Sequence, residues 1–169
     1  KGLFYGLVSL HQILYTSQKE ENGIPLLKIK DSPRFDHRGF MLDLSRNFFP
    51  KEKILQILEF MAYYKLNTLD LRLFDDEGWR LEIPGLQELT QIGSKRGFTI
   101  DEKDQLFPMY GSGSGKKMSY GNGFLSRKDF VEILKAASKR NIRVIPQISF
   151  PSHARSAVIS MKARYENFL

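Results

Sequence analysis

The stretch Leu69–Arg80 constrains the fold more than any other part of the chain, because an alternating apolar segment ends in charged and aromatic residues. Its leucines alternate with other residues, so they would point to one face of a strand while Asp70 and Arg72 point to the opposite face. Asp75 and Asp76 come directly at the end of this strand. Charged residues on a face that should be enclosed, followed by paired carboxylates, indicate a functional site.

The flanking sequence alternates predicted strands with predicted helices. Apolar residues at helical spacing delimit the helices, with Pro50 as the first helical residue of one and the capping-box spacing of Ser126 and Asp129 opening another. Short apolar runs delimit the strands. Strands are predicted at 40–44, 68–74 and 142–148, the last of them buried, and helices at 2–15, 50–65, 126–140 and 154–169. This order is typical of an α/β fold with a parallel sheet and right-handed crossovers.

Polar side chains gather where each of the three predicted strands ends. They are Asp43, Ser45 and Arg46 after the first strand, Asp75 and Asp76 at the second, and residues 147–153 after the third. Ligands of parallel α/β folds bind at the carboxyl ends of the strands, so we expect these clusters to converge. The long irregular stretch 77–124 is also typical of a loop that serves a site.

Composition excludes several classes of function. The chain has 169 residues, 41% of them hydrophobic, which suffices for one ordinary core. The net charge of +7 is spread along the chain, so nucleic-acid binding is not expected. No apolar run approaches the roughly 20 residues that span a bilayer. With no cysteine and no zinc-like spacing of its histidines, the sequence predicts neither a metal site nor a cofactor.

Two motifs fail on inspection. The tract Gly111–Lys117 is similar to a phosphate-binding loop, but its glycine spacing is one residue short, and Lys117 stands where that loop needs a hydroxyl residue. The same tract has Gly113 where a nucleophile elbow has its serine. We interpret it as a flexible loop tip.

Four motifs in one order carry a resemblance to a known family. They are Arg38-Gly39-Phe40-Met41-Leu42-Asp43, Met61-Ala62-Tyr63-Tyr64-Lys65-Leu66-Asn67, Asp75-Asp76-Glu77-Gly78-Trp79-Arg80 and Pro151-Ser152-His153-Ala154. With them the chain resembles glycoside hydrolase family 20, the β-N-acetylhexosaminidases. The resemblance implies a (β/α)8 TIM barrel, of which this chain supplies about the first three βα units.

The resemblance also implies a reaction and roles for residues. The substrate's own 2-acetamido oxygen attacks the anomeric carbon, assisted by an Asp-Glu pair expected on a strand beyond Leu169. Arg38 matches a sugar-binding arginine, and Trp79 a residue beside the substrate. Asp75 and Asp76 match the family's aspartate pair, one of which orients His153, and His153 in turn contacts the glutamic acid that protonates the leaving group.

Departures from the family pattern leave other functions open. Asp70 and Arg72 replace usual histidines and, as neighbours on one face, are able to form an ion pair, and Phe74 replaces a threonine. Gln147, Ser149 and Ser152 replace a glutamate, an aspartate or asparagine, and a glycine. These favour a degenerate glycan-binding or scaffolding relative as the alternative to a hydrolase. A Rossmann-like domain is the third reading, but no glycine fingerprint follows the first strand.

The resemblance predicts how the chain is organised. Residues 1–30 would be a helix and linker from a preceding domain, and residues 31–169 the first part of the catalytic barrel. Because the chain begins at Lys1 and ends within a predicted helix, we expect a piece of a longer polypeptide whose remainder completes the site. The expected partner is a glycan with a terminal N-acetylhexosamine, and family members are mostly secreted, periplasmic or lysosomal.

Overall fold

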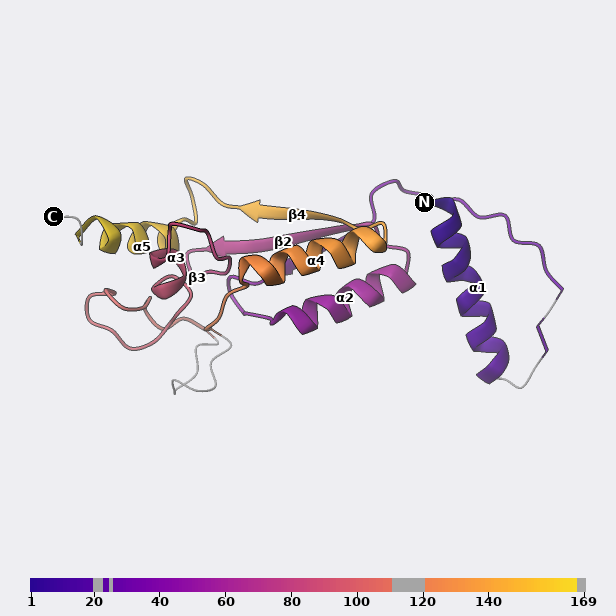
Figure 1. Ribbon diagram of the computed structural model, residues 1–169, viewed down its shortest axis with the longest axis horizontal. Helices are drawn as coiled ribbons and strands as arrows, with labels where there is room; N and C mark the ends of the chain where they lie inside the picture. The colour runs from indigo at the N-terminus through magenta and orange to yellow at the C-terminus, as the bar shows by residue number, and fades with distance from the viewer. Residues whose placement is uncertain (20–22, 25, 111–120, 167–169) are drawn as a thin grey trace.

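The computed structural model describes residues 1–19, 23–24, 26–110 and 121–166, which form an elongated α/β unit (Figure 1). The predicted loop tip at Gly111–Lys117 lies outside the described residues. The elements are α1 Gly2–Lys19, β1 Gly39–Asp43, α2 Lys51–Tyr63, β2 Thr68–Asp75, β3 Gly78–Trp79, α3 Glu88–Gln91, α4 Arg127–Lys139, β4 Arg143–Ile148 and α5 Arg155–Glu166.

The sheet is built around β2, which pairs in parallel with β1 on one side and with β4 on the other. The register places Leu71 opposite Leu42 of β1 and Pro146 of β4. The short β3 pairs antiparallel with the end of β2. The predicted parallel sheet is therefore confirmed for its three long strands, whose carboxyl ends share one edge.

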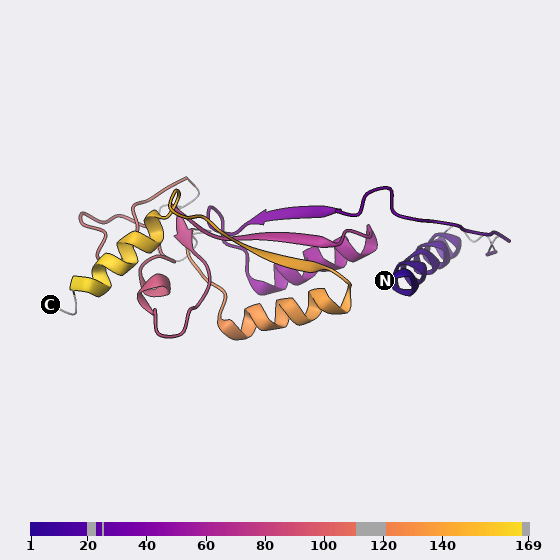
Figure 2. The same cartoon turned by 90° about the horizontal axis from the view of Figure 1, so that it is seen from above.

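Helices α2 and α4 cover one face of this sheet (Figure 2). The leucines of β2 that face them are 0% to 2% exposed, as the alternation in the sequence predicts. They pack with apolar residues of the two helices, and the core includes Ile54, Leu58, Met61, Ile133 and Ala137. The opposite face carries Asp70 and Arg72, and a closed barrel would enclose it.

Helix boundaries follow local capping chemistry. Ser126 Oγ accepts a hydrogen bond from the Asp129 amide, and the Asp129 carboxylate accepts one from the Ser126 amide, so the predicted capping box opens α4. The sequence suggested Pro50 as the first helical residue of α2, but Pro50 is its N-cap. Both helices start close together, and Lys51 Nζ joins them by lying 2.8 Å from Asp129 Oδ1.

The prediction that β4 is a buried strand was wrong. Its residues are half-buried or exposed along the whole strand. The reason is that β4 lies at the edge of the described sheet and pairs only with β2 among the described strands. The apolar composition of residues 142–148 had indicated a central, buried strand.

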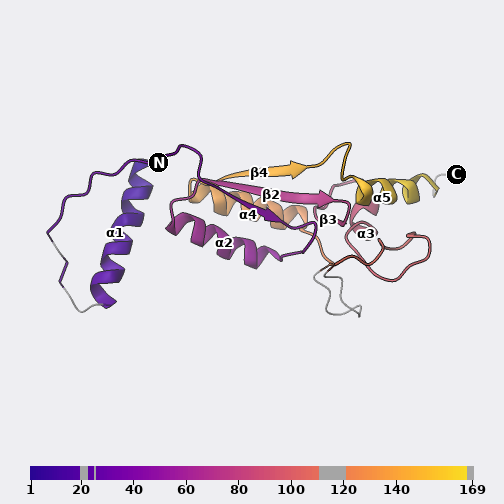
Figure 3. The ribbon, with the colours of Figure 1, turned by 180° about the vertical axis from the view of Figure 1, so that it is seen from behind.

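Helix α1 lies beyond the amino ends of the strands, at the opposite end of the molecule from α5 (Figure 3). It is held there by Lys65 Nζ, which donates to Ser9 Oγ at 2.7 Å, and by Gln12 Nε2, which donates to the Tyr63 carbonyl at 2.8 Å. Within the described residues, no helix is both long enough and apolar enough to cross a membrane. The division of the chain after residue 30 stays a prediction.

Candidate active site

The carboxyl edge of the sheet centres on Asp75, the last residue of β2, which is 1% exposed. Its Oδ2 lies 3.1 Å from Arg46 Nη2 and also forms an ion pair with Arg72. Its Oδ1 lies 3.7 Å from His153 Nδ1. Polar groups from the ends of β1, β2 and β4 thus meet at one carboxylate, and the expected convergence is confirmed.

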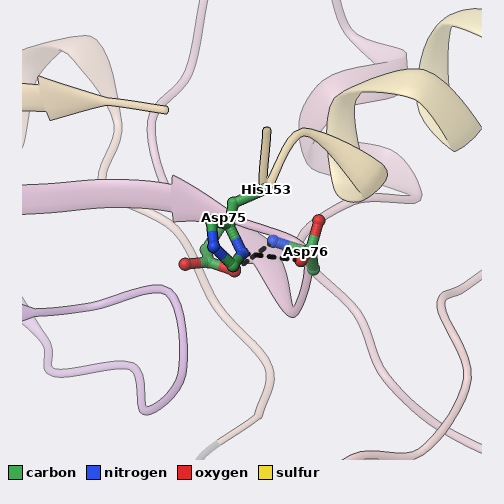
Figure 4. Close-up of side chains that lie close together, drawn as sticks. All are labelled: Asp75, Asp76 and His153. Carbon is green, nitrogen blue, oxygen red and sulfur yellow. Dashed lines mark hydrogen bonds and ion pairs between the residues drawn. The ribbon is translucent and has the colours of Figure 1, made fainter. Parts of the chain in front are cut away.

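His153 lies beside both aspartates (Figure 4). Its Nδ1 is 2.9 Å from Asp76 Oδ2, and the Arg155 amide donates to Asp76 Oδ1 at 3.1 Å. Partial burial alone would raise the pKa of Asp76, but the Arg155 amide and His153 outweigh it, and the pKa is lowered. Asp76 is therefore an anion near neutral pH, which suits it to fix the His153 ring with Nδ1 as the donor.

The first turn of α5 is tied to the same edge by several side chains. Ser156 Oγ donates to the Asp75 carbonyl, and Arg155 forms an ion pair with Glu102 of the long loop. The Arg155 guanidinium also lies over the Phe107 ring, 5.4 Å from its centroid. These contacts hold His153 at the site through the segment that follows it.

Arg46 belongs to the site, although the sequence reasoning did not name it as a site residue. Its guanidinium lies 2.7 Å from Asp43 Oδ2 and 3.5 Å from Glu77 Oε1, in addition to its contact with Asp75. Burial lowers the pKa of Arg46, but the three carboxylates outweigh it and raise the pKa. The available signal was its position just after a strand, within a polar cluster.

Arg38 is not brought to this site. It precedes β1, so it lies at the amino edge of the sheet. Its Nε donates to the Lys65 carbonyl at 2.8 Å and its Nη1 to the Phe35 carbonyl at 2.7 Å. Its Nη2 lies 3.3 Å from Tyr5 Oη. Arg38 therefore joins α1 and the amino end of the sheet.

Two further sequence expectations concern β2 and its neighbour. Trp79 stacks on Phe74, with ring centroids 4.2 Å apart, and its indole N–H donates to the Leu81 carbonyl. The ion pair that Asp70 and Arg72 are able to form is not present among the described residues, because Arg72 pairs with Asp75 instead. Asp70 Oδ1 is buried and has no hydrogen-bond partner among the described residues.

Asp75, Asp76 and His153 place three potential metal-ligand atoms within 4.8 Å of one another. However, Asp75 Oδ2 already contacts the guanidinium groups of Arg46 and Arg72. Two fixed positive charges at the same carboxylate oppose the binding of a cation. The arrangement instead suits a hydrogen-bonded histidine whose other ring nitrogen can meet a partner.

Residues 35–168 match the sequence model of the glycosyl hydrolase family 20 catalytic domain. The chain belongs to glycosyl hydrolase family 20. It is 51% identical to N,N'-diacetylchitobiase of Vibrio harveyi over 168 residues, 99% of this chain and 19% of that protein. It is 46% identical to beta-hexosaminidase B of Pseudoalteromonas piscicida, covering 98% of this chain and 21% of that one. The chain thus spans about a fifth of the length of these family 20 relatives.

Solved family 20 structures share the fold. The exo-β-N-acetylglucosaminidase of V. harveyi in complex with N-acetylglucosamine superposes with a TM-score of 0.70 and 42% identity, over 78% of this chain and 19% of that one. The β-N-acetylhexosaminidase of Bacteroides fragilis gives a TM-score of 0.75 and 30% identity, over 95% and 29%. The parallel strands and their helices are therefore part of the family's (β/α)8 barrel.

Proposed function

We propose that this chain forms one wall of the active site of a β-N-acetylhexosaminidase, which removes terminal N-acetylglucosamine or N-acetylgalactosamine from glycans. The observation that carries the proposal is the contact between His153 and Asp76 at the carboxyl edge of a family 20 sheet. Active sites of barrels of this type lie at that edge. The relatives' names point to the same substrate class.

In this mechanism the substrate's acetamido oxygen attacks the anomeric carbon, and an Asp-Glu pair outside this chain supports that attack and protonates the leaving oxygen. Asp76 holds His153 Nδ1, which leaves the opposite ring nitrogen, Nε2, to meet the glutamic acid. That contact would tune the proton affinity of the acid. Asp75 supports the histidine from its second oxygen, and its charge is balanced by Arg46 and Arg72.

For binding the sugar hydroxyls, the geometry favours Arg46 over Arg38. Each of the three guanidinium nitrogens of Arg46 faces one carboxylate. A guanidinium carries five N–H donors, so, counting the contacts with described residues, Nη1 and Nη2 each keep one for a ligand. The Arg46 side chain is 45% exposed, at the edge where ligands bind. Trp79, which stacks on Phe74 at the end of β2, stays a prediction as a residue beside the substrate.

A second function, a degenerate glycan-binding or scaffolding relative, is favoured by one specific contact. Arg72 forms an ion pair with Asp75 Oδ2, and its Nη2 lies 3.5 Å from Ser149 Oγ. Ser149 and Gln147 stand where the family has acidic and amide groups. Gln147 in place of the glutamate removes a negative charge near the site, and so does Ser149 where the family has an aspartate, so turnover could be lost while the fold persists.

A chimera separates these functions. Residues 1–169 replace the aligned segment of V. harveyi N,N'-diacetylchitobiase, and hydrolysis of a chromogenic N-acetylglucosaminide is measured beside the unaltered relative. We expect turnover that falls at least about 100-fold on His153→Ala, the scale of a lost acid-base contribution. A folded chimera that binds N-acetylglucosamine without turnover favours the degenerate relative. The isolated chain is expected to be inactive, since its barrel is open.

A further inference from the structure

Two buried guanidinium groups bind the backbone of the turn that follows β1. Arg80 Nε lies 3.0 Å from the Leu44 carbonyl, and Arg80 Nη2 lies 2.7 Å from the Ser45 carbonyl. Arg96 Nη2 lies 2.8 Å from the Arg46 carbonyl. Three consecutive carbonyls of one turn are therefore held by two arginines that come from a different part of the chain.

Arg80 is fully buried, at 0% exposure, and forms no ion pair with any described carboxylate. Its Nη1 donates to the Ser94 carbonyl at 2.9 Å and to the Gly123 carbonyl at 3.0 Å. Burial, reinforced by the nearby charge of Arg96, lowers the pKa of Arg80 to about 9, so it stays charged at neutral pH. Burying an unpaired charge is costly, and the carbonyl bonds offset that cost only if they all form.

Arg96 contacts the backbone of Arg46 directly and is linked to its side chain through Glu77. One of its nitrogens bonds the Arg46 carbonyl, and Nη1 lies 3.0 Å from Glu77 Oε2. The other oxygen of Glu77 faces Arg46 Nε at 3.5 Å. Asp43 Oδ1 also stabilises this turn, because it accepts hydrogen bonds from the backbone amides of Ser45 and Arg46 at 2.9 and 3.1 Å.

We propose that Arg80 and Arg96 are positioning residues that fix the Leu44–Arg46 turn and thereby aim the Arg46 guanidinium at the substrate. This inference rests on the proposed function, because it takes Arg46 as the residue that binds the sugar. It assigns a task to the arginine of the Trp79-Arg80 motif and to Arg96. Both act through Arg46 and need not touch the substrate.

A double-mutant cycle in the chimera tests this assignment. Arg80→Lys keeps the charge but loses the planar fork, so we expect KM to rise roughly 10-fold with kcat changed less than about 3-fold. In an Arg46→Ala background, the same substitution should change KM less than about 2-fold, because the group that it aims is gone. Equal losses in both backgrounds would show a purely structural role and overturn the proposal.

Two controls keep the result interpretable. Arg140→Lys changes an arginine that bonds the Ala136 carbonyl at the far end of α4, and it should leave KM unchanged. The cycle is repeated with Arg96→Lys, for which we expect a smaller rise in KM. If Arg80→Lys prevents folding, the Arg96→Lys cycle tests the proposal instead. A KM that responds to Arg140→Lys as strongly as to Arg80→Lys or Arg96→Lys would contradict the proposal.

Amide hydrogen exchange gives a readout that does not need activity. In the chimera, Arg80→Lys or Arg96→Lys should speed exchange of the Ser45 and Arg46 amides at least about 10-fold, while Arg140→Lys should not. If the parent chimera is folded but inactive, the proposed function fails and this measurement alone decides about the turn. Unchanged exchange at these amides would overturn the positioning role whatever the kinetics.

Discussion

His153 Nδ1 lies 2.9 Å from Asp76 Oδ2, although the two residues are 77 positions apart in the chain. The contact joins the residue that follows β2 to the segment that precedes α5. It forms because β2 and β4 run in parallel and end at the same edge. A histidine held through Nδ1 by a carboxylate presents its Nε2 in one orientation, which is what an acid-orienting histidine requires.

Asp76→Asn should therefore weaken catalysis, although a side chain of the same size still contacts His153. The amide keeps the shape of the side chain but loses the charge that fixes the His153 ring, so kcat/KM of the chimera should fall roughly 10- to 100-fold. Asp31→Asn is the matched control, because Asp31 pairs with Lys65 at the amino edge. Similar losses from both substitutions would contradict a specific role for Asp76.

Substitutions of Arg46 and of Arg38 should have different effects on substrate binding. Arg46→Ala should raise KM for the chromogenic N-acetylglucosaminide at least about 10-fold, through loss of charged hydrogen-bond donors to sugar hydroxyls. Arg38→Ala should lower the melting temperature with little change in KM, since its bonds go to backbone carbonyls at the other edge. A large KM effect confined to Arg38→Ala would restore the role that the resemblance suggested.

The sequence predicts the parts of this structure that follow from local periodicity. The alternation along β2 assigns its leucines to the core, and the Ser126–Asp129 spacing locates the start of α4. The convergence of polar clusters follows from the direction of parallel strands. The same rule separates Arg38, which precedes β1, from Arg46, which follows it, so strand direction was a signal that the motif comparison overlooked.

Other contacts leave no pattern in the sequence. Arg80 and Arg96 bond backbone carbonyls, and any residue type supplies a carbonyl. The choice of Asp75 over Asp70 as partner of Arg72 depends on three-dimensional placement at the end of β2, which spacing alone does not reveal. The exposure of β4 depends on which strands lie beside it. These features required the folded arrangement.

Gly78→Ala tests how tightly the buried Arg80 is held. A Cβ at Gly78 would overlap the Arg80 guanidinium, which its carbonyl bonds keep from moving away. Overpacking of this kind costs about 1–3 kcal/mol, so the urea midpoint of unfolding should fall. Gly6→Ala is the control, because a Cβ at Gly6 in α1 meets no atom within 4 Å. An unchanged midpoint for Gly78→Ala would mean that Arg80 is mobile.

The capping box of α4 should make stability depend on pH in the acid range. Lys51 and Ser126 lower the pKa of Asp129 from 3.8 to about 2. A carboxyl with a lowered pKa in the folded state stabilises that state above its unfolded pKa, and the contribution is lost as pH falls through about 4 toward 2. Asp129→Asn should therefore lower the urea midpoint of the chain at pH 6, and the gap should close by about pH 2. Asp101→Asn, an exposed carboxyl whose Oδ2 is 3.8 Å from Lys103 Nζ, is the control and should show no such gap. A gap for Asp129→Asn that stays constant from pH 6 to pH 2 would assign its effect to shape and not to charge.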